Sequence, residues 1–169
     1  FDALGADERL RREIGVISHA SCLYLDLTAF ENLLFYAKLY SLEDPETKAN
    51  QAIGEVGLKL RRYDRVRTFS RGMQQRLSIA RATLHDPPIL FLDEPFTGLD
   101  LQATNILKEY LHKLHTGKRT LIMTTHDFSC GLEMCDRVAI QSQGKFVLME
   151  SLNHIDRENF KNIYTEVLE

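Results

Sequence analysis

The stretch that decides the fold is ILFLDEPFTGLD, residues 89–100. Four apolar residues lead directly into two carboxylates, Asp93 and Glu94, and a proline and a polar turn follow. The apolar run does not alternate with polar residues, so we expect a strand with both faces buried, as in a parallel sheet. In open parallel sheets, ligands bind beyond the carboxyl ends of the strands. The stretch therefore predicts a site at Asp93 and Glu94.

Length and composition fit one α/β domain of ordinary character. The chain has 169 residues, of which 44% are hydrophobic and 27% charged, enough for one core. The formal net charge of -3 gives no general attraction to nucleic acid, and we expect no nucleic-acid partner. No apolar run is long enough to cross a bilayer. The three cysteines have no C-x-x-C spacing, which favours reduced thiols in a cytosolic compartment.

Helices and strands are expected on both sides of this stretch. The expected strands are 14–18, 120–125 and a pair about the turn at Gly144, and the expected helices are 29–40, 45–57, 71–84, 101–115, 128–134 and 156–168. Thr28 and Glu31 have the spacing of a capping box at the start of one of these helices. This order of elements predicts an α/β fold with a mainly parallel core. Residues 29–84 are almost all helical and should form a separate lobe.

The residues at the strand ends are suited to metal-assisted hydrolysis. Asp93 could hold Mg²⁺, Glu94 could accept a proton from an attacking water, and His126 could hold a transferring phosphoryl group. The alternative is that Asp93 caps the next helix and His126 is a strand-end histidine with ordinary partners. His19 and Cys22 have a spacing that metal sites use, but two donors do not complete a tetrahedral site.

A second candidate site begins the helix that follows Ser70. A helix N-terminus presents free N–H groups and a positive dipole end, which suit a phosphate. Ser70 adds a hydroxyl, Arg71 adds charge, and Gly72 allows close approach of the backbone. The alternative is an ordinary N-cap, since serine is favoured there in any case.

Together these pieces resemble the ABC-type ATPases along essentially the whole chain. FSRGMQ at 69–74 is similar to that family's signature motif, and ILFLDE at 89–94 to its Walker B strand. FTGLD at 96–100 resembles the D-loop, and TTHD at 124–127 the switch histidine. GVISHASCLYLDLTAFENL, from residue 15, resembles the Q-loop region, and GLEMCDRVAIQSQGKFV, from residue 131, resembles the strands after the switch histidine.

The resemblance implies an ATPase that uses ATP and Mg²⁺. It implies Glu94 as general base, His126 as a second catalytic residue and Asp93 as the metal ligand. The implied nucleotide-binding residues are His19, Ser70, Arg71, Gly72, Met73, Gln74 and Asp100. In this family two ATPase domains pair head to tail, so the signature would act on ATP that the partner domain holds. The implied helical subdomain is about 22–84, and the implied core portion is about 1–21 and 85–169.

Three departures from the family pattern stand out. His19 occupies the place of the Q-loop glutamine, and Arg71 and Met73 replace a glycine and a glutamine of the signature. None of the nine glycines begins the G-x-x-x-x-G-K-[ST] pattern whose backbone cradles phosphates. We therefore expect a truncated P-loop NTPase that lacks the Walker A segment and is inactive alone.

The resemblance also implies a membrane partner. Residues 22–36 would meet integral transporter subunits, with Tyr24, Phe30, Phe35 and Tyr36 as contact candidates. Core packing is the alternative for each of them, and we favour it for Phe35. The expected location is the cytoplasmic face of the cell membrane, as a peripheral subunit.

The cargo follows only from finer likeness. The SRGM motif and the Ser-His pair at the Q-loop resemble the heme-exporter ATPase of cytochrome c biogenesis, which we favour over ABC-2 type exporters of drugs or polysaccharides. A soluble ABC ATPase acting on ribosomes stays open, and so does a non-catalytic interaction module.

Overall fold

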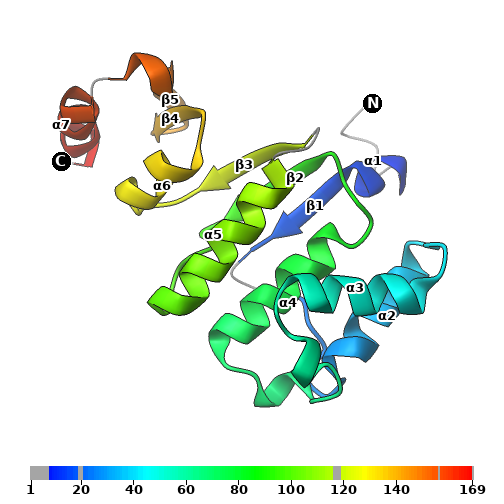
Figure 1. Ribbon diagram of the computed structural model, residues 1–169. Coiled ribbons are helices and arrows are strands. Elements are labelled where there is room, and N and C mark those ends of the chain that lie inside the picture. Colours follow the sequence, from blue (N-terminus) through cyan, green and yellow to red (C-terminus); the bar gives the residue numbers. More distant parts are fainter. Residues whose placement is uncertain (1–7, 19–20, 116–118, 156, 169) are drawn as a thin grey trace. The chain divides into compact units, whose positions relative to one another are not determined.

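The computed structural model describes residues 8–18, 21–115, 119–155 and 157–168. The chain divides into two compact units, Phe1–Thr124 and Thr125–Glu169 (Figure 1). A short helix that the sequence did not predict, α1 (Glu8–Glu13), precedes the first strand.

The first unit is organised around a three-stranded parallel sheet. Its strands are β1 (Ile14–Ile17), β2 (Ile89–Asp93) and β3 (Thr120–Thr124), in the order β1-β2-β3. Both neighbouring pairs run parallel. The prediction of an α/β fold with a parallel core is therefore confirmed, and the carboxyl ends of the three strands lie at one edge of the sheet.

One face of this sheet is buried and the other is not. Ile17, Leu90 and Leu92 are almost inaccessible to solvent. On the opposite face the register places Val16 beside Phe91 and Phe91 beside Ile122. These three side chains are 51%, 39% and 46% exposed, so the prediction that both faces are buried was wrong. The physical reason is that burial depends on what packs over a strand, which the apolar run alone does not contain.

The buried face lies close against the helix that follows Ser70. A Cβ atom at Gly15 would come within 2.5 Å of the Ala82 carbonyl oxygen and of a Leu90 methyl group. The backbone of β1 therefore approaches this helix as closely as only glycine allows. Arg81 adds a hydrogen bond from its guanidinium to the carbonyl oxygen of Val16, 2.9 Å away.

The chain between β1 and β2 is helical, as predicted. Its elements are α2 (Ala29–Leu39), α3 (Pro45–Glu55), the 3-10 turns Lys59–Arg61 and Val66–Thr68, and α4 (Arg71–Thr83). Side chains just before each helix start it: Thr28 forms the predicted capping box with Glu31, Asp44 caps α3, and Ser70 caps α4.

A buried asparagine holds the loop that leads into α2. Asn32 is completely buried, and its side-chain oxygen accepts from the Tyr24 N–H at 2.8 Å. Its amide nitrogen donates to the carbonyl oxygens of Tyr24 and Thr28, both at 2.9 Å. The side chain therefore pairs with loop backbone as another strand would, which satisfies polar groups that water cannot reach.

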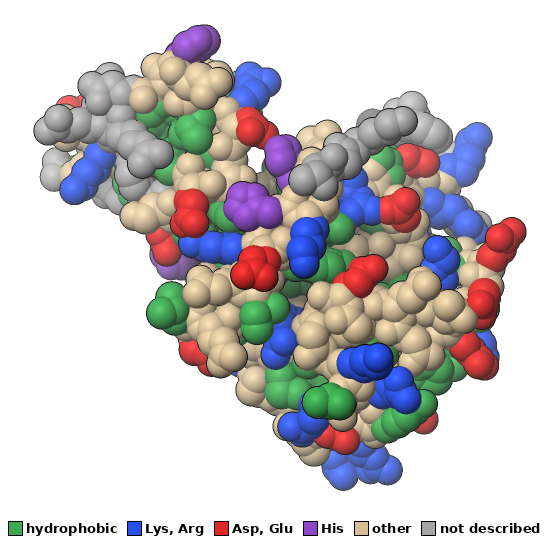
Figure 2. Space-filling view, in the orientation of Figure 1, with side chains coloured by type: hydrophobic (Ala, Val, Ile, Leu, Met, Phe, Trp, Pro, Cys, Tyr) green, Lys and Arg blue, Asp and Glu red, His purple; other side chains and the backbone are tan. Residues whose placement is uncertain are grey.

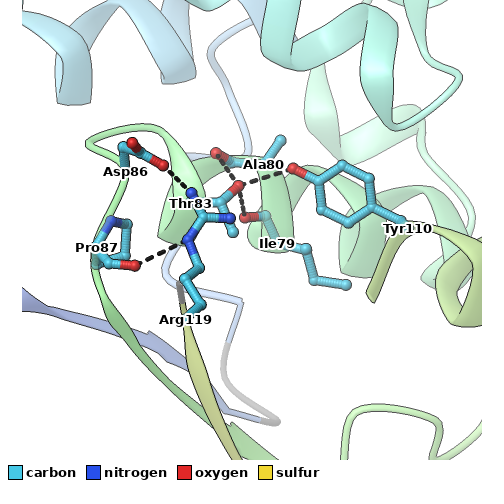
Figure 3. A network of polar contacts seen from close by, with 7 residues as sticks. All are labelled: Ile79, Ala80, Thr83, Asp86, Pro87, Tyr110 and Arg119. Atoms are coloured by element: carbon cyan, nitrogen blue, oxygen red, sulfur yellow. Dashed lines mark hydrogen bonds and ion pairs between the residues drawn. The ribbon is translucent and has the colours of Figure 1, made fainter. Parts of the chain in front are cut away.

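A polar network joins α4 to α5 (Leu101–His115) and to the start of β3 (Figure 3). The hydroxyl groups of Thr83 and Tyr110 lie 2.9 Å apart in a hydrogen bond. Arg119 donates to the Pro87 carbonyl oxygen at 2.9 Å and forms an ion pair with Asp86. Burial raises the pKa of Tyr110 to about 12. These contacts fix the turn between α4 and β2.

The second unit is a small α/β assembly with its own core. It contains α6 (Phe128–Met134), an antiparallel hairpin of β4 (Arg137–Ser142) and β5 (Lys145–Ser151), a 3-10 turn (Leu152–His154) and α7 (Arg157–Leu168). Gln143 and Gly144 both have positive φ, as the tight turn of a hairpin requires. Leu132, Ile140 and Phe160 are its most buried side chains. The predicted hairpin about Gly144 is confirmed.

Candidate functional site

Asp93 ends β2 at the edge where the parallel strands finish. It lies opposite Thr124 in the register, and its Oδ1 accepts a hydrogen bond of 2.7 Å from the Thr124 hydroxyl. The side chain is exposed. It does not cap the following helix, since that role belongs to Asp100, whose Oδ1 accepts from the Ala103 N–H at 2.7 Å. Asp93 is thus an oriented carboxylate at the strand end.

Glu94 has an unusual backbone conformation. Its φ is +48°, in the left-handed region that non-glycine residues rarely adopt. Its N–H donates to the Thr124 carbonyl oxygen at 3.1 Å, and its Oε2 accepts from the Thr97 hydroxyl at 3.1 Å. Backbone strain of this kind costs on the order of 1 kcal/mol and often occurs where a side chain must be aimed for function. The partly exposed carboxylate therefore has a fixed direction.

The turn after Glu94 is ordered by its own hydrogen bonds. The Thr97 N–H donates to the Glu94 carbonyl oxygen and the Leu99 N–H to that of Phe96, both at 3.2 Å. Gly98 has φ +73°, which suits glycine. The turn ends at Asp100, which caps α5. The predicted D-loop stretch is thus a compact connection between β2 and α5.

The start of α4 has the predicted geometry of a capped helix. Ser70 is extended, and its hydroxyl accepts from the Met73 N–H at 3.3 Å. The Gln74 side chain donates to the Phe69 carbonyl oxygen at 3.3 Å. Arg71 is exposed at the first position of the helix. The ordinary N-cap contact is therefore present, and the phosphate-binding role of Ser70, Arg71 and Gly72 stays a prediction.

The structure brings α4 and the Glu94–Asp100 turn together, which the motifs alone did not predict. Gln75 donates from its side-chain amide to the Pro95 carbonyl oxygen at 3.1 Å. Burial lowers the pKa of Arg76, and the charge of Asp100 acts in the opposite direction. The sequence motifs did not single out Gln75 or Arg76. A usable signal was their position one helical turn after Arg71 and Gly72.

His126 belongs to the second unit, where it follows the end of β3 by two residues. Its side chain is exposed, and its carbonyl oxygen accepts from the Tyr164 hydroxyl at 3.4 Å. The neighbouring Asp127 caps α6 through the Cys130 N–H at 3.0 Å. The role of His126 beside Glu94 stays a prediction because the two residues lie in separate units. His19 lies outside the described residues.

The donor set suits a hard cation bound with help from its substrate. Among the described residues, no group of three or more His, Cys, Asp or Glu side chains is arranged to hold a metal ion. Mg²⁺ is usually bound by one or two carboxylates together with phosphate oxygens and water. Asp93 fits that pattern, whereas Cys22 does not belong to a zinc site with any described residue.

Aromatic side chains gather on α2 and the loop before it. The Tyr24 and Phe35 rings meet edge to face at 5.3 Å, and so do the Phe35 and Tyr36 rings at 5.2 Å. Tyr24 is 48% and Phe35 is 42% exposed, so the favoured expectation of core packing for Phe35 was wrong. Phe30 packs instead against Tyr63, at 6.0 Å. The exposed Tyr24 and Phe35 thus form an aromatic cluster with the half-buried Tyr36.

The surface has no extended field of one charge on the face shown in Figure 2, where acidic and basic side chains are intermixed. No helix within the described ranges combines the length and apolar character needed to cross a membrane.

Known proteins resemble this chain in sequence, and a solved structure resembles it in fold. Residues 3–97 match the ABC transporter family. A linearmycin resistance ATP-binding protein of Bacillus subtilis is 37% identical over 82% of this chain and 45% of its own length. A fluoroquinolones export ATP-binding protein of Mycobacterium tuberculosis is 40% identical over 82% of this chain and 45% of its own length. The chain thus spans about half the length of these curated relatives.

Two further comparisons cover almost the whole chain. The ABC transporter ATP-binding protein NatA of Bacillus subtilis is 34% identical over 96% of this chain and 68% of its own length. A solved structure of an ATP-binding subunit of an ABC transporter is 28% identical and superimposes with a TM-score of 0.80. The superposition covers 94% of this chain and 70% of the chain in the solved structure.

Proposed function

This chain belongs to the ABC transporter family as an ATP-binding domain, and we propose that it is part of a subunit that couples ATP hydrolysis to export across a membrane. The observation that carries the proposal is the junction of α4 with the Glu94–Asp100 turn. It joins Ser70 at a helix N-terminus and Glu94 at a strand end through the Gln75–Pro95 hydrogen bond. One segment suits a phosphate and the other suits an attacking water.

The residues divide the chemistry between them. Asp93 would hold Mg²⁺, which offsets the charge of the ATP phosphates when bound. Glu94 would accept the proton of the water that attacks the γ-phosphate, and His126 would hold the phosphoryl group during transfer. Ser70 and Gly72, with Arg71, would close over ATP on a second ATPase domain. Their helix N-terminus offers N–H groups and positive potential to its phosphates.

The phosphate cradle must come from a segment outside these 169 residues, because they contain no G-x-x-x-x-G-K-[ST]. By itself the chain is expected to bind ATP weakly or not at all. Residues 22–84 would form the helical subdomain, and the rest of the chain would belong to the nucleotide-binding core.

The names of the relatives favour a small organic molecule as the exported cargo. Their names refer to linearmycin resistance, to fluoroquinolones export and to Nod factor export. Heme export for cytochrome c biogenesis, which the signature motif favoured, finds no support in these names. We therefore prefer the ABC-2 type alternative.

The partners follow from the same family. The aromatic cluster of Tyr24, Phe35 and Tyr36 would contact integral membrane subunits, because exposed aromatic side chains are typical of interfaces. A second ATPase domain would pair head to tail with this one. Such a subunit would sit peripherally on the cytoplasmic face of the cell membrane.

A chimera tests the proposal. A G-x-x-x-x-G-K-[ST] phosphate-loop segment of an ABC ATPase is joined ahead of residue 1, and ATP binding and hydrolysis are measured with Mg²⁺. We expect both activities, and we expect Glu94→Gln to abolish hydrolysis but retain binding. Glu109→Gln, at an exposed position of α5, is the matched control. Hydrolysis by Glu94→Gln near the unmodified rate would contradict the general-base role. A folded chimera that binds no ATP would contradict the ATP-binding function itself.

A further inference from the structure

Arg71 covers the one glycine of the turn between β2 and α5. A Cβ atom built on Gly98 would lie 2.7 Å from the Arg71 Cζ and 2.9 Å from its Nε and Nη1. Real Cβ atoms essentially never come within 3.0 Å of a heavy atom that belongs to a residue other than their own and its two chain neighbours. The planar guanidinium therefore occupies the space that any other residue at position 98 would fill. Arg71 forms no ion pair with any residue in the described ranges, so packing defines its position.

Two neighbouring contacts lie on the same side of α4. Gln75, four residues after Arg71, donates to the Pro95 carbonyl oxygen at 3.1 Å. Gly72 faces α5, since a Cβ atom there would lie 2.9 Å from the Ala103 Cβ. The Gln75 contact holds the beginning of the turn, and the Gly72 contact holds the helix after it. Arg71 covers the middle of the turn, at Gly98, which has no side chain of its own to shield the backbone.

We propose that Arg71 is a positioning residue that holds the Glu94–Asp100 turn against the first turn of α4. Its functional meaning rests on the proposed function: the contact keeps Ser70 and Glu94 in one rigid arrangement while they serve two different ATP molecules. Lysine cannot replace this contact, because its ammonium group is a point charge on a flexible stem and has no flat face to cover a glycine.

The first test is amide hydrogen exchange on the 169-residue chain. The reporters are the Thr97 and Leu99 N–H groups, whose hydrogen bonds close the turn. Arg71→Ala should speed their exchange about two- to fivefold, the ratio expected when one packing contact is lost from a local opening. Arg71→Lys should do the same. Arg67→Ala removes another exposed arginine, which forms a 3.7 Å ion pair with Asp26, and should leave both rates unchanged.

Amides of β2 report any general loss of stability, so exchange that rises equally there and in the turn counts against the proposal. If the Thr97 and Leu99 amides exchange at the unchanged rate in Arg71→Ala, the proposal is overturned, and Arg71 is then only a solvated surface arginine. Wild-type exchange in Arg71→Lys also overturns the part played by the flat guanidinium.

A second test uses the glycine and needs no nucleotide. Gly98→Ala displaces the guanidinium and strains a positive φ, whereas Gly144→Ala strains a similar φ, +77°, with no heavy atom within 4 Å. Gly98→Ala should therefore shift the unfolding equilibrium about two- to fivefold more than Gly144→Ala. That excess should vanish in the Arg71→Ala background. An excess that persists there overturns the proposal. Because both tests work without ATP, they can fail or succeed independently of the proposed function.

Discussion

The Glu94→Gly variant should be more stable to unfolding than the Glu94→Ala variant. The φ of +48° at Glu94 lies in the left-handed region, which costs an L-residue about 1–2 kcal/mol and costs glycine almost nothing. Glu94→Ala and Glu94→Gly both lose the 3.1 Å hydrogen bond from the Thr97 hydroxyl, so that loss cancels in the comparison. Part of the backbone gain is offset because glycine has more freedom in the unfolded chain. We expect Glu94→Gly to exceed Glu94→Ala by about 1 kcal/mol in the free energy of unfolding.

Urea unfolding followed by far-UV circular dichroism measures this difference, which corresponds to about a fivefold change in the unfolding equilibrium. The adjacent residue is the matched control. Asp93 is the last residue of β2 and has no positive φ, so there Asp93→Gly should be less stable than Asp93→Ala by about 0.5–1 kcal/mol. A Gly-minus-Ala difference in the free energy of unfolding that is positive at position 94 and negative at position 93 would indicate backbone strain at Glu94. Equal or lower stability of Glu94→Gly relative to Glu94→Ala would refute the reasoning.

Three further predictions concern the core, and urea unfolding checks each of them. Gly15→Ala should destabilise by about 2 kcal/mol or more, because its Cβ would lie 2.5 Å from a backbone oxygen, whereas Gly54→Ala, in open space on α3, should stabilise by about 0.5–1 kcal/mol. Burial raises the pKa of Tyr110 to about 12, against about 10 in the unfolded chain, so between these pH values only the folded chain keeps this proton. The free energy of unfolding should therefore fall by roughly 2–3 kcal/mol as pH rises from 10 to 12. Tyr110→Phe should remove that slope and Tyr63→Phe, at an exposed ring, should keep it. Asn32→Leu should cost about 2–4 kcal/mol, because it leaves buried loop backbone without hydrogen bonds, and little loss would contradict the assigned pairing.

The local elements could be predicted from the sequence because their causes are local. The Thr28–Glu31 box and the Ser70 cap each act within three residues, and both helices begin where these side chains place them. The unbroken apolar run at 89–92 likewise predicted a parallel strand that ends at Asp93. The motif order from Ser70 to Asp100 was enough to indicate the family.

Tertiary structure decided how these pieces meet. The exposure of Val16, Phe91 and Ile122 depends on what packs over the sheet, and no pattern within β2 contains that information. The contact of Arg71 with Gly98 arises because α4 and the turn fold against each other across 27 residues of sequence. The left-handed backbone of Glu94 accompanies its hydrogen bond to Thr124, which is also distant in the sequence. The sequence by itself therefore determined most of the elements, their caps and the position of Asp93 at the end of a strand. Only folding determined which side chains share a surface, because contacts between distant residues depend on the packing of the whole unit.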